Sequence, residues 1–214
     1  MHHTMKAAIF DMDGTLIDSM GHWRALNCSF VREQGIDLTP REEAQLRSLT
    51  GMQVVAYVKA HFGIEADFPA LLERAAKAME TVYQAGVPLK PGAMPYLRRL
   101  KARGVKRVLA TATPAKIALS ALNQTGLVGE LDYIFSTEMI GGHKGDPAFY
   151  DALCARIGEK KEDCVMFEDA LYAMQGARAA GLGVVGVADE TNEPDREAIT
   201  AVCDRVIDSY DELD

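Results

Sequence analysis

Short apolar runs recur along the chain, and each one stops at polar residues. The runs are Lys6–Phe10, Arg107–Ala110, Tyr133–Phe135, Cys164–Phe167, Val184–Val187 and Arg205–Ile207. Short apolar runs without alternation are typical of strands that are buried on both faces of a parallel sheet. The pattern therefore predicts a parallel sheet at the centre of the fold.

Segments with helical spacing of apolar residues lie between these runs. The clearest are Ala93–Arg103, Pro114–Gln124, Pro147–Ile157 and Leu171–Ala180. A glycine, the residue that most often ends a helix, follows each of them: Gly104, Gly126, Gly158 and Gly181. The alternation of strand and helix predicts an α/β fold built on a doubly wound, Rossmann-like parallel sheet.

One long segment breaks this alternation. Between residues 18 and 86 only helical patterns occur, at Met20–Gln34, Arg41–Leu49, Gln53–Phe62 and Phe68–Ala85. A block of this size is too long for a loop. The sequence therefore predicts a helical cap domain at residues 18–87, inserted into an α/β core domain formed by residues 1–17 and 88–214. We expect the two chain crossings, near residues 16–18 and 88–91, to act as a hinge pair.

The charge and the hydropathy of the chain argue against nucleic acids and membranes as partners. The 214 residues carry a net charge of −8, without any block of five or more Lys or Arg residues. Electrostatic capture of nucleic acid or of an anionic membrane therefore has little support. No apolar run approaches the ~20 residues that a membrane span needs. We expect neither nucleic acid nor membrane as a partner, and the sequence favours no particular oligomeric state.

The cysteines argue for a reducing compartment. Cys28, Cys154, Cys164 and Cys203 lie within apolar periodic stretches, and no two of them form a Cys-x-x-Cys pair. These spacings argue against a zinc site and against a disulfide framework. Free thiols are typical of proteins in reducing compartments, so we expect a cytoplasmic protein.

Residues that can carry chemistry follow four of the predicted strands. In an open α/β sheet, ligands bind in the crevice beyond the carboxyl ends of the strands. The residues found there are Asp11 and Asp13 after the first strand, Thr111 after the second, Lys144 beyond the third, and Glu168 and Asp169 after the fourth. Four carboxylates that converge on one edge repel one another unless a hard cation lies among them. The spacing therefore predicts a Mg²⁺ site.

Taken together, these segments resemble the four motifs of the haloacid dehalogenase superfamily, and the resemblance covers nearly the whole chain. The matching residues are Phe10–Ser19 for the first motif, Thr111 for the second, Lys144 for the third, and Phe167–Ala170 with Gly176, Ala177, Ala180 and Gly181 for the fourth. The helical insert resembles the α-helical cap of the β-phosphoglucomutase and phosphatase subfamily. One departure is Gly145, because the family usually has proline directly after the lysine.

The resemblance implies a role for each motif residue. Asp11 would attack phosphorus and form an aspartyl-phosphate, and Asp13 would protonate the leaving oxygen and later deprotonate the attacking water. Thr111 would donate a hydrogen bond to a phosphoryl oxygen, and Lys144 would offset negative charge. The implied Mg²⁺ ligands are Asp11, Glu168, Asp169 and the backbone carbonyl of Asp13.

The expected partner is a small phosphorylated metabolite. Candidate substrate contacts lie in the motifs and in the cap: Thr111, Ala112, Lys144, His22, Arg47 and Gly51. The family resemblance favours a sugar phosphate. Trp23, next to His22, is either a further residue facing the site or part of the core.

Three reactions or roles compete. The presence of Asp13 excludes a dehalogenase and a phosphonoacetaldehyde hydrolase, which lack an acid there. A β-phosphoglucomutase-like phosphotransferase typically carries a histidine in the first cap helix, and an ungapped count places Trp23 rather than His22 at that position, which favours a phosphatase. A non-catalytic phospho-ligand-binding protein would be expected to lack Asp11 or Asp13, and both are present.

Overall fold

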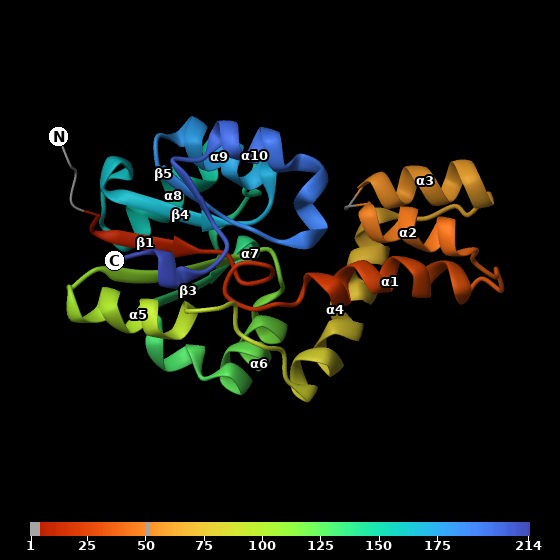
Figure 1. Ribbon diagram of the computed structural model, residues 1–214, viewed down its shortest axis with the longest axis horizontal. Coiled ribbons are helices and arrows are strands. Elements are labelled where there is room, and N and C mark those ends of the chain that lie inside the picture. Colours follow the sequence, from red (N-terminus) through yellow and green to blue (C-terminus); the bar gives the residue numbers. More distant parts are fainter. Residues whose placement is uncertain (1–4, 50–51) are drawn as a thin grey trace.

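The computed structural model describes residues 5–49 and 52–214, and its centre is a six-stranded parallel sheet (Figure 1). The strands are β1 (Ala7–Phe10), β2 (Lys106–Thr111), β3 (Tyr133–Ser136), β4 (Cys164–Glu168), β5 (Gly183–Val187) and β6 (Arg205–Ile207). Their order is β3-β2-β1-β4-β5-β6, and every neighbouring pair is parallel. The chain builds outward from β1 in both directions, so the switch point of the sheet lies at β1, β2 and β4.

Helices cover both faces of the sheet (Figure 1). Those packed on one face are α5 (Ala93–Ala102) and α6 (Ala115–Thr125), and those on the other are α8 (Pro147–Ile157), α9 (Leu171–Ala180) and α10 (Arg196–Val202). A short helix, α7 (Thr137–Ile140), follows β3. Four 3-10 helices complete the core: η1 (Leu127–Glu130), η2 (Lys161–Asp163), η3 (Glu190–Asp195) and η4 (Tyr210–Glu212).

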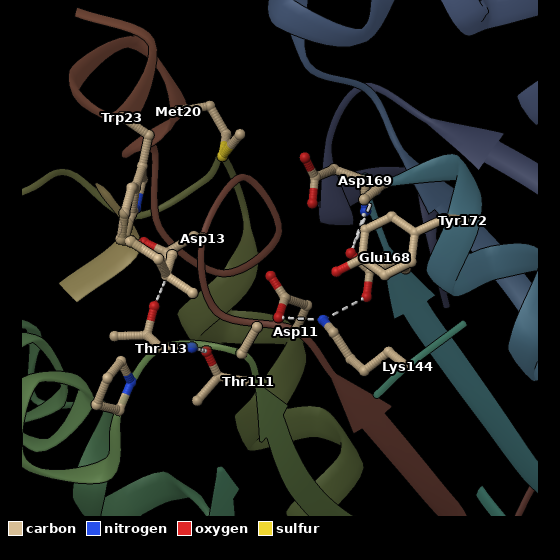
Figure 2. A pocket seen from close by; sticks show the side chains of 14 residues that line it. Asp11, Asp13, Met20, Trp23, Thr111, Thr113, Lys144, Glu168, Asp169 and Tyr172 are labelled. Carbon is tan, nitrogen blue, oxygen red and sulfur yellow. Dashed lines mark hydrogen bonds and ion pairs between the residues drawn. The ribbon is translucent and has the colours of Figure 1, made fainter. Parts of the chain in front are cut away.

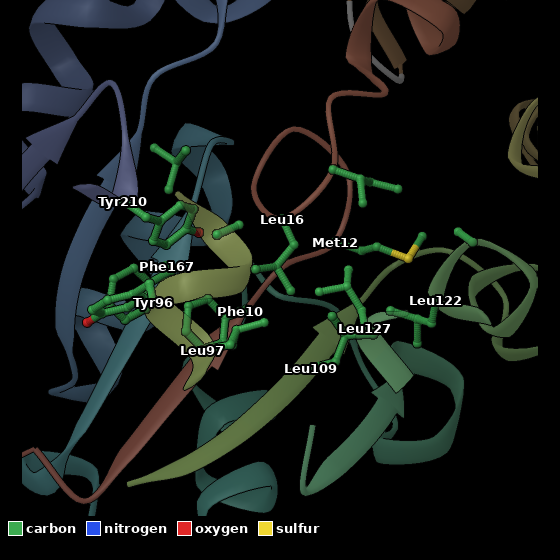
Figure 3. Packing of buried hydrophobic residues seen from close by; sticks show 14 of the residues in the cluster. Phe10, Met12, Leu16, Tyr96, Leu97, Leu109, Leu122, Leu127, Phe167 and Tyr210 are labelled. Carbon is green, nitrogen blue, oxygen red and sulfur yellow. The ribbon is translucent and has the colours of Figure 1, made fainter. Parts of the chain in front are cut away.

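Aromatic side chains fill the layer between the sheet and α5 (Figure 3). Phe10 of β1 stacks on Phe167 of β4 with ring centroids 4.6 Å apart, and Tyr96 and Tyr210 pack around this pair. Full burial of a phenylalanine side chain stabilises a fold by about 1.5–3 kcal/mol. Because Phe10 and Phe167 precede Asp11 and Glu168, their packing fixes the carboxyl ends of the two central strands.

The cap consists of four helices that stand apart from the sheet (Figure 1): α1 (Met20–Arg32), α2 (Pro40–Ser48), α3 (Met52–Phe62) and α4 (Phe68–Ala85). Their apolar faces form a small core of their own, which includes Cys28, Val31, Leu46 and Val58. All four lie within residues 18–87, the range that we propose for the cap.

The two chain crossings between cap and core run side by side. The backbone N–H of Asp18 donates to the carbonyl of Pro88 over 2.8 Å, and the N–H of Lys90 donates to the carbonyl of Leu16 over 2.9 Å. Ile17 and Leu89 form an isolated antiparallel bridge between them. A movement of the cap must therefore bend both crossings together.

The fold class predicted from the sequence is confirmed, because the sheet is parallel and wound on both sides. The expected strands and helices agree with the observed ones to within two residues at nearly every end. The helices α7 and α10 had no clear periodicity in the sequence and were not predicted. Within residues 5–49 and 52–214, no helix combines the length and apolar character needed to cross a membrane.

Candidate active site

The motif residues meet in a pocket of about 200 Å³ beyond the carboxyl ends of β1, β2 and β4 (Figure 2). The core and the cap both contribute to its walls. The lining residues are Asp11, Asp13, Met20, Trp23, Leu72, Thr111, Ala112, Thr113, Pro114, Lys144, Glu168, Asp169, Ala170 and Tyr172. The crevice at the switch point of an α/β sheet is where ligands generally bind.

Asp11 and Lys144 form a buried ion pair at the base of this pocket. The Lys144 Nζ lies 2.5 Å from Asp11 Oδ1 and 2.7 Å from Glu168 Oε2. Burial raises the pKa of Asp11 to about 7, and Lys144 opposes this rise. Burial alone would lower the pKa of Lys144, but Asp11 and Glu168 hold it well above its usual value. Lys144 therefore remains charged and favours the ionised form of Asp11.

A close contact between the backbone of α9 and the loop that carries Lys144 positions this lysine in the pocket. It lies in the loop before α8, and the loop packs against Gly176 of α9. A Cβ at position 176 would lie 2.1 Å from the carbonyl oxygen of Lys144 and 2.9 Å from the carbonyl carbon of Gly145. Glycine at position 176 thus permits the contact that carries the lysine into the pocket. Its neighbour His143 is exposed and does not line the pocket.

Three buried carboxylates could hold a metal ion. Ligand oxygens of Asp11, Glu168 and Asp169 all lie within 4.8 Å of one another. Burial and the neighbouring Glu168 and Asp11 raise the pKa of Asp169 well above its usual value. One lysine among three carboxylates leaves an excess of negative charge, which a divalent cation with oxygen ligands would neutralise. The donor set therefore fits Mg²⁺.

Several groups hold Asp169 in this cluster. The Thr15 hydroxyl donates to its Oδ1 over 3.3 Å, and the Asn192 amide donates to its Oδ2 over 2.7 Å. The carboxylate also lies against Gly14, where a Cβ would come within 2.6 Å of Asp169 Oδ2. Gly14 has a φ of 79°, which disfavours other residues. The tight turn at Gly14, after β1, therefore packs directly against Asp169, the residue after β4.

Asp13 lies in a different environment from Asp11. The hydroxyls of Ser19 and Thr113 donate to Asp13 over 2.6 and 2.7 Å, and the hydroxyl of Tyr83 is a third donor. Burial raises the pKa of Tyr83, which keeps it a donor. One carboxylate is thus paired with a lysine and the other with hydroxyls, an arrangement that allows two carboxyl groups to play different roles.

The second motif offers a hydroxyl to the pocket. Thr111 is the last residue of β2 and is buried, and its Oγ1 accepts a hydrogen bond from the backbone N–H of Thr113 over 3.0 Å. This bond leaves the hydroxyl proton of Thr111 able to point at a ligand. Ala112, between them, is exposed and lines the pocket.

The structure brings some of the expected cap residues to the pocket and leaves others out. Trp23 of α1 lines it, whereas His22 lines a second pocket beside Asp18 and Lys90. Arg47 is exposed on α2 and is not among the lining residues. Gly51 lies outside the described residues.

Sequence reasoning missed several residues that shape the site: Met20, Leu72, Tyr83, Thr113, Tyr172 and Asn192. Thr113 lies two residues after Thr111 of the second motif, and this spacing was the only feature of the sequence that could have indicated its place in the site. The others come from elements whose contact with the site depends on tertiary packing. Trp23 and Tyr172 lie on opposite sides of the pocket (Figure 2).

Comparisons with known proteins show the family to which the chain belongs. The family model of the haloacid dehalogenase-like hydrolases matches residues 5–181. The validoxylamine A 7′-phosphate phosphatase of Streptomyces hygroscopicus subsp. limoneus is 31% identical over 197 residues, which cover 91% of this chain and 89% of that protein. Hexitol phosphatase B of Escherichia coli K12 is 28% identical and covers 88% of this chain and 86% of its own length.

Solved structures share the fold. A putative β-phosphoglucomutase from Thermotoga maritima superposes with a TM-score of 0.74 at 23% identity, covering 95% of this chain and 94% of its own. The prediction from the four motifs is confirmed: this chain belongs to the haloacid dehalogenase-like hydrolases.

Proposed function

We propose that this protein is a Mg²⁺-dependent phosphatase that hydrolyses a sugar phosphate or a similar small phosphorylated metabolite through a phosphoryl group carried on Asp11. The observation that carries the proposal is the different pairing of two carboxylates in one pocket. Asp11 faces Lys144 at 2.5 Å, and Asp13 faces the hydroxyls of Ser19, Tyr83 and Thr113. A lysine partner favours the ionised form that a nucleophile needs, and hydroxyl partners can donate to a carboxylate or accept from a carboxylic acid, which suits a group that transfers protons.

Each residue has a defined task in the reaction. The ionised Asp11 attacks phosphorus while the leaving oxygen takes a proton from Asp13. Lys144 and the Thr111 hydroxyl stabilise the negative charge that develops on the phosphoryl oxygens. Asp13 then accepts a proton from the water that attacks the phosphorylated Asp11, and inorganic phosphate leaves. Mg²⁺, held by Asp11, Glu168, Asp169 and the backbone carbonyl of Asp13, would supply charge neutralisation at the phosphoryl group.

The composition of the pocket favours hydrolysis of a monophosphate over a phosphoglucomutase-type exchange. Among the described residues that line the pocket, Lys144 is the only cation, and it already pairs with two carboxylates. A bisphosphate would require a second group of cations for its other phosphate. The cap wall consists instead of Met20, Trp23 and Leu72. Trp23 and Tyr172 offer apolar faces, on which the C–H groups of a sugar or sugar alcohol can pack.

The relatives support the same class of substrate. The two curated relatives described above are named validoxylamine A 7′-phosphate phosphatase and hexitol phosphatase B. A third relative, from Thermotoga maritima, is named a phosphorylated carbohydrates phosphatase and is 24% identical over 190 residues. These names agree with a sugar or sugar-alcohol phosphate for this chain.

The test compares Asp13→Asn on two leaving groups. A hexitol phosphate releases an alkoxide that needs a proton, so phosphorylation of Asp11 should slow by ~10²–10⁴-fold. p-Nitrophenyl phosphate releases a stable anion, so this step should slow much less. Single-turnover kinetics measure both steps, and the matched control is Asp37→Asn, an exposed carboxylate between α1 and α2. Equal losses on both substrates would contradict the assignment of Asp13, and absence of turnover by the unmodified protein would contradict the activity.

A further inference from the structure

A buried arginine of the cap reaches toward the core. Arg24 lies on α1 and is only 4% exposed. Its guanidinium donates to the backbone carbonyl of Leu49, at the end of α2, and to Asn192 Oδ1 over 3.3 Å. Burial lowers the pKa of Arg24, and the charge of Asp169 opposes this effect. Burial of a charged group is costly unless the group is paired and hydrogen-bonded, so these contacts of Arg24 matter to the stability of this arrangement.

Asn192 connects this arginine to the metal cluster. It lies on η3 of the core, and its Nδ2 donates both to Asp169 Oδ2 over 2.7 Å and to the Asp169 backbone carbonyl over 3.0 Å. The oxygen of the amide faces the guanidinium of Arg24, and the nitrogen faces the carboxylate. The oxygen and the nitrogen of the Asn192 amide are therefore both hydrogen-bonded, one to the cap and the other to the core, and these bonds fix the orientation of the side chain.

We propose that Arg24 and Asn192 are positioning residues that couple the docking of the cap to the binding of the metal ion. Asn192 orients the Asp169 carboxylate, and Arg24 holds Asn192 only while the cap lies against the core. Mutation of a group that orients a metal ligand typically lowers metal affinity by ~10–100-fold. Because coupling between two equilibria is reciprocal, a bound metal ion should also favour the docked cap. The proposal rests on the Mg²⁺ site proposed above.

A purely structural role for Arg24 makes a different prediction. Arg24 also holds the end of α2 through the Leu49 carbonyl, so its loss could loosen the cap without affecting the metal. Asn27 offers a matched control, since its side chain donates to the same Leu49 carbonyl over 3.1 Å and to Leu46 over 2.9 Å. In the described contacts Asn27 does not reach the core. The variant Asn27→Leu therefore tests a loosened cap alone.

The experiment is a double-mutant cycle in which the Kd of the metal ion is measured in the absence of substrate. Mn²⁺ serves as the probe, because electron paramagnetic resonance measures its free concentration, and Mg²⁺ competition gives the Kd for Mg²⁺. The full-length variants are Asn192→Leu, Arg24→Met, their combination and Asn27→Leu. Asn192→Leu should raise the Kd by ~10-fold or more. Arg24→Met should raise it by ~5-fold in the unmodified background and should leave it unchanged in the Asn192→Leu background.

Hydrogen exchange supplies the reciprocal measurement. Saturating Mg²⁺ should slow amide exchange in α1 and α2 of the unmodified protein but not of the Asn192→Leu variant. This comparison does not use Arg24→Met, so it still tests the proposal if that variant fails to fold. The proposal is overturned if Asn192→Leu binds the metal normally, if Arg24→Met weakens binding equally in both backgrounds, or if Asn27→Leu reproduces the effect of Arg24→Met. Failure of the unmodified protein to bind Mn²⁺ would instead overturn the metal site itself and the coupling with it.

Discussion

The substitution Gly176→Ala tests whether a backbone contact positions Lys144, the lysine that we propose for catalysis. Gly176 lies in α9, remote in sequence from Lys144, and its side-chain position is occupied by the Lys144–Gly145 backbone. A Cβ there would lie 2.1 Å from the Lys144 carbonyl oxygen, whereas real Cβ contacts essentially never fall below 3.0 Å. Because the interior is close-packed, the loop and α9 must separate by roughly 0.9 Å.

Two opposing effects set the change in stability. Replacing glycine by alanine in a helix interior favours folding by ~1 kcal/mol, and overpacking costs ~1–3 kcal/mol. The free energy of unfolding should therefore fall by at most ~2 kcal/mol. Activity should respond more strongly, because the Lys144 Nζ lies at 2.5 and 2.7 Å from Asp11 and Glu168. A displacement of about 1 Å breaks at least one of these contacts and can cost ~10²-fold in rate.

The assay combines turnover of p-nitrophenyl phosphate with urea unfolding. The matched control is Gly21→Ala, since Gly21 is a helical glycine of α1 whose added Cβ would meet no atom within 4 Å. It should leave kcat/KM unchanged. A Gly176→Ala variant that is folded and retains full kcat/KM would refute the reasoning, because the lysine would then be placed independently of this contact.

Three further outcomes are expected. Asp11→Asn should remain folded and lose all but a few per cent of turnover, since the nearly isosteric amide is no nucleophile; full activity in a clean preparation would contradict the role of Asp11. Exhaustive treatment with EDTA should abolish phosphatase activity and Mg²⁺ should restore it, and activity that survives chelation would contradict the metal site. Burial would raise the pKa of Asp132, but hydrogen bonds from the side chain and backbone of Arg107 outweigh this and hold it below its usual value. The stabilisation is therefore present at neutral pH and lost as the pH falls through the folded-state pKa. Because the Asp132 side chain is more than one third exposed, solvent screens its interaction with Arg107, and Asp132→Asn should lower the free energy of unfolding by at most ~1 kcal/mol at pH 7 and by much less at pH 2. Urea titrations at both pH values measure this, and an equal loss at both would contradict the ionic origin of the effect.

The sequence predicts the core of this fold well because its signals are local. Each buried strand is a short apolar run, and each of the four core helices predicted from the sequence is followed by a glycine such as Gly126 or Gly158, both of which adopt the left-handed conformation. The convergence of the motif residues also follows from local rules, because parallel strands deliver their carboxyl ends to one edge. Asp11, Thr111 and Glu168 illustrate this, since each ends or directly follows a strand.

The contacts between cap and core could not be predicted in the same way. Tyr83 lies 70 residues from Asp13, and Asn192 lies 168 residues from Arg24. Helical periodicity shows which face of α1 or α4 is apolar, but it does not specify the angle at which the cap meets the core. That angle decides that Trp23 lines the pocket while His22, one residue earlier, lines a different one. The ungapped count that places Trp23 at the position of the mutase histidine comes from the family resemblance and not from the chain's own pattern.

The two carboxylates that we propose for catalysis also differ in which part of the molecule holds them. Asp11 pairs with Lys144, which also pairs with Glu168, and all three residues belong to the core, so the position of the cap does not affect the pairing of the proposed nucleophile. Asp13 is held by Thr113 of the core, by Ser19 at the chain crossing, and by Tyr83 of α4, which in turn accepts a hydrogen bond from the indole N–H of Trp23 over 3.2 Å. In the mechanism that we propose, proton transfer by Asp13 therefore depends on the cap, and Trp23 of the cap lines the same pocket. A substrate whose leaving group packs against the cap would stabilise the cap position in which Tyr83 contacts Asp13. Recognition of the leaving group would in this way be linked to its protonation.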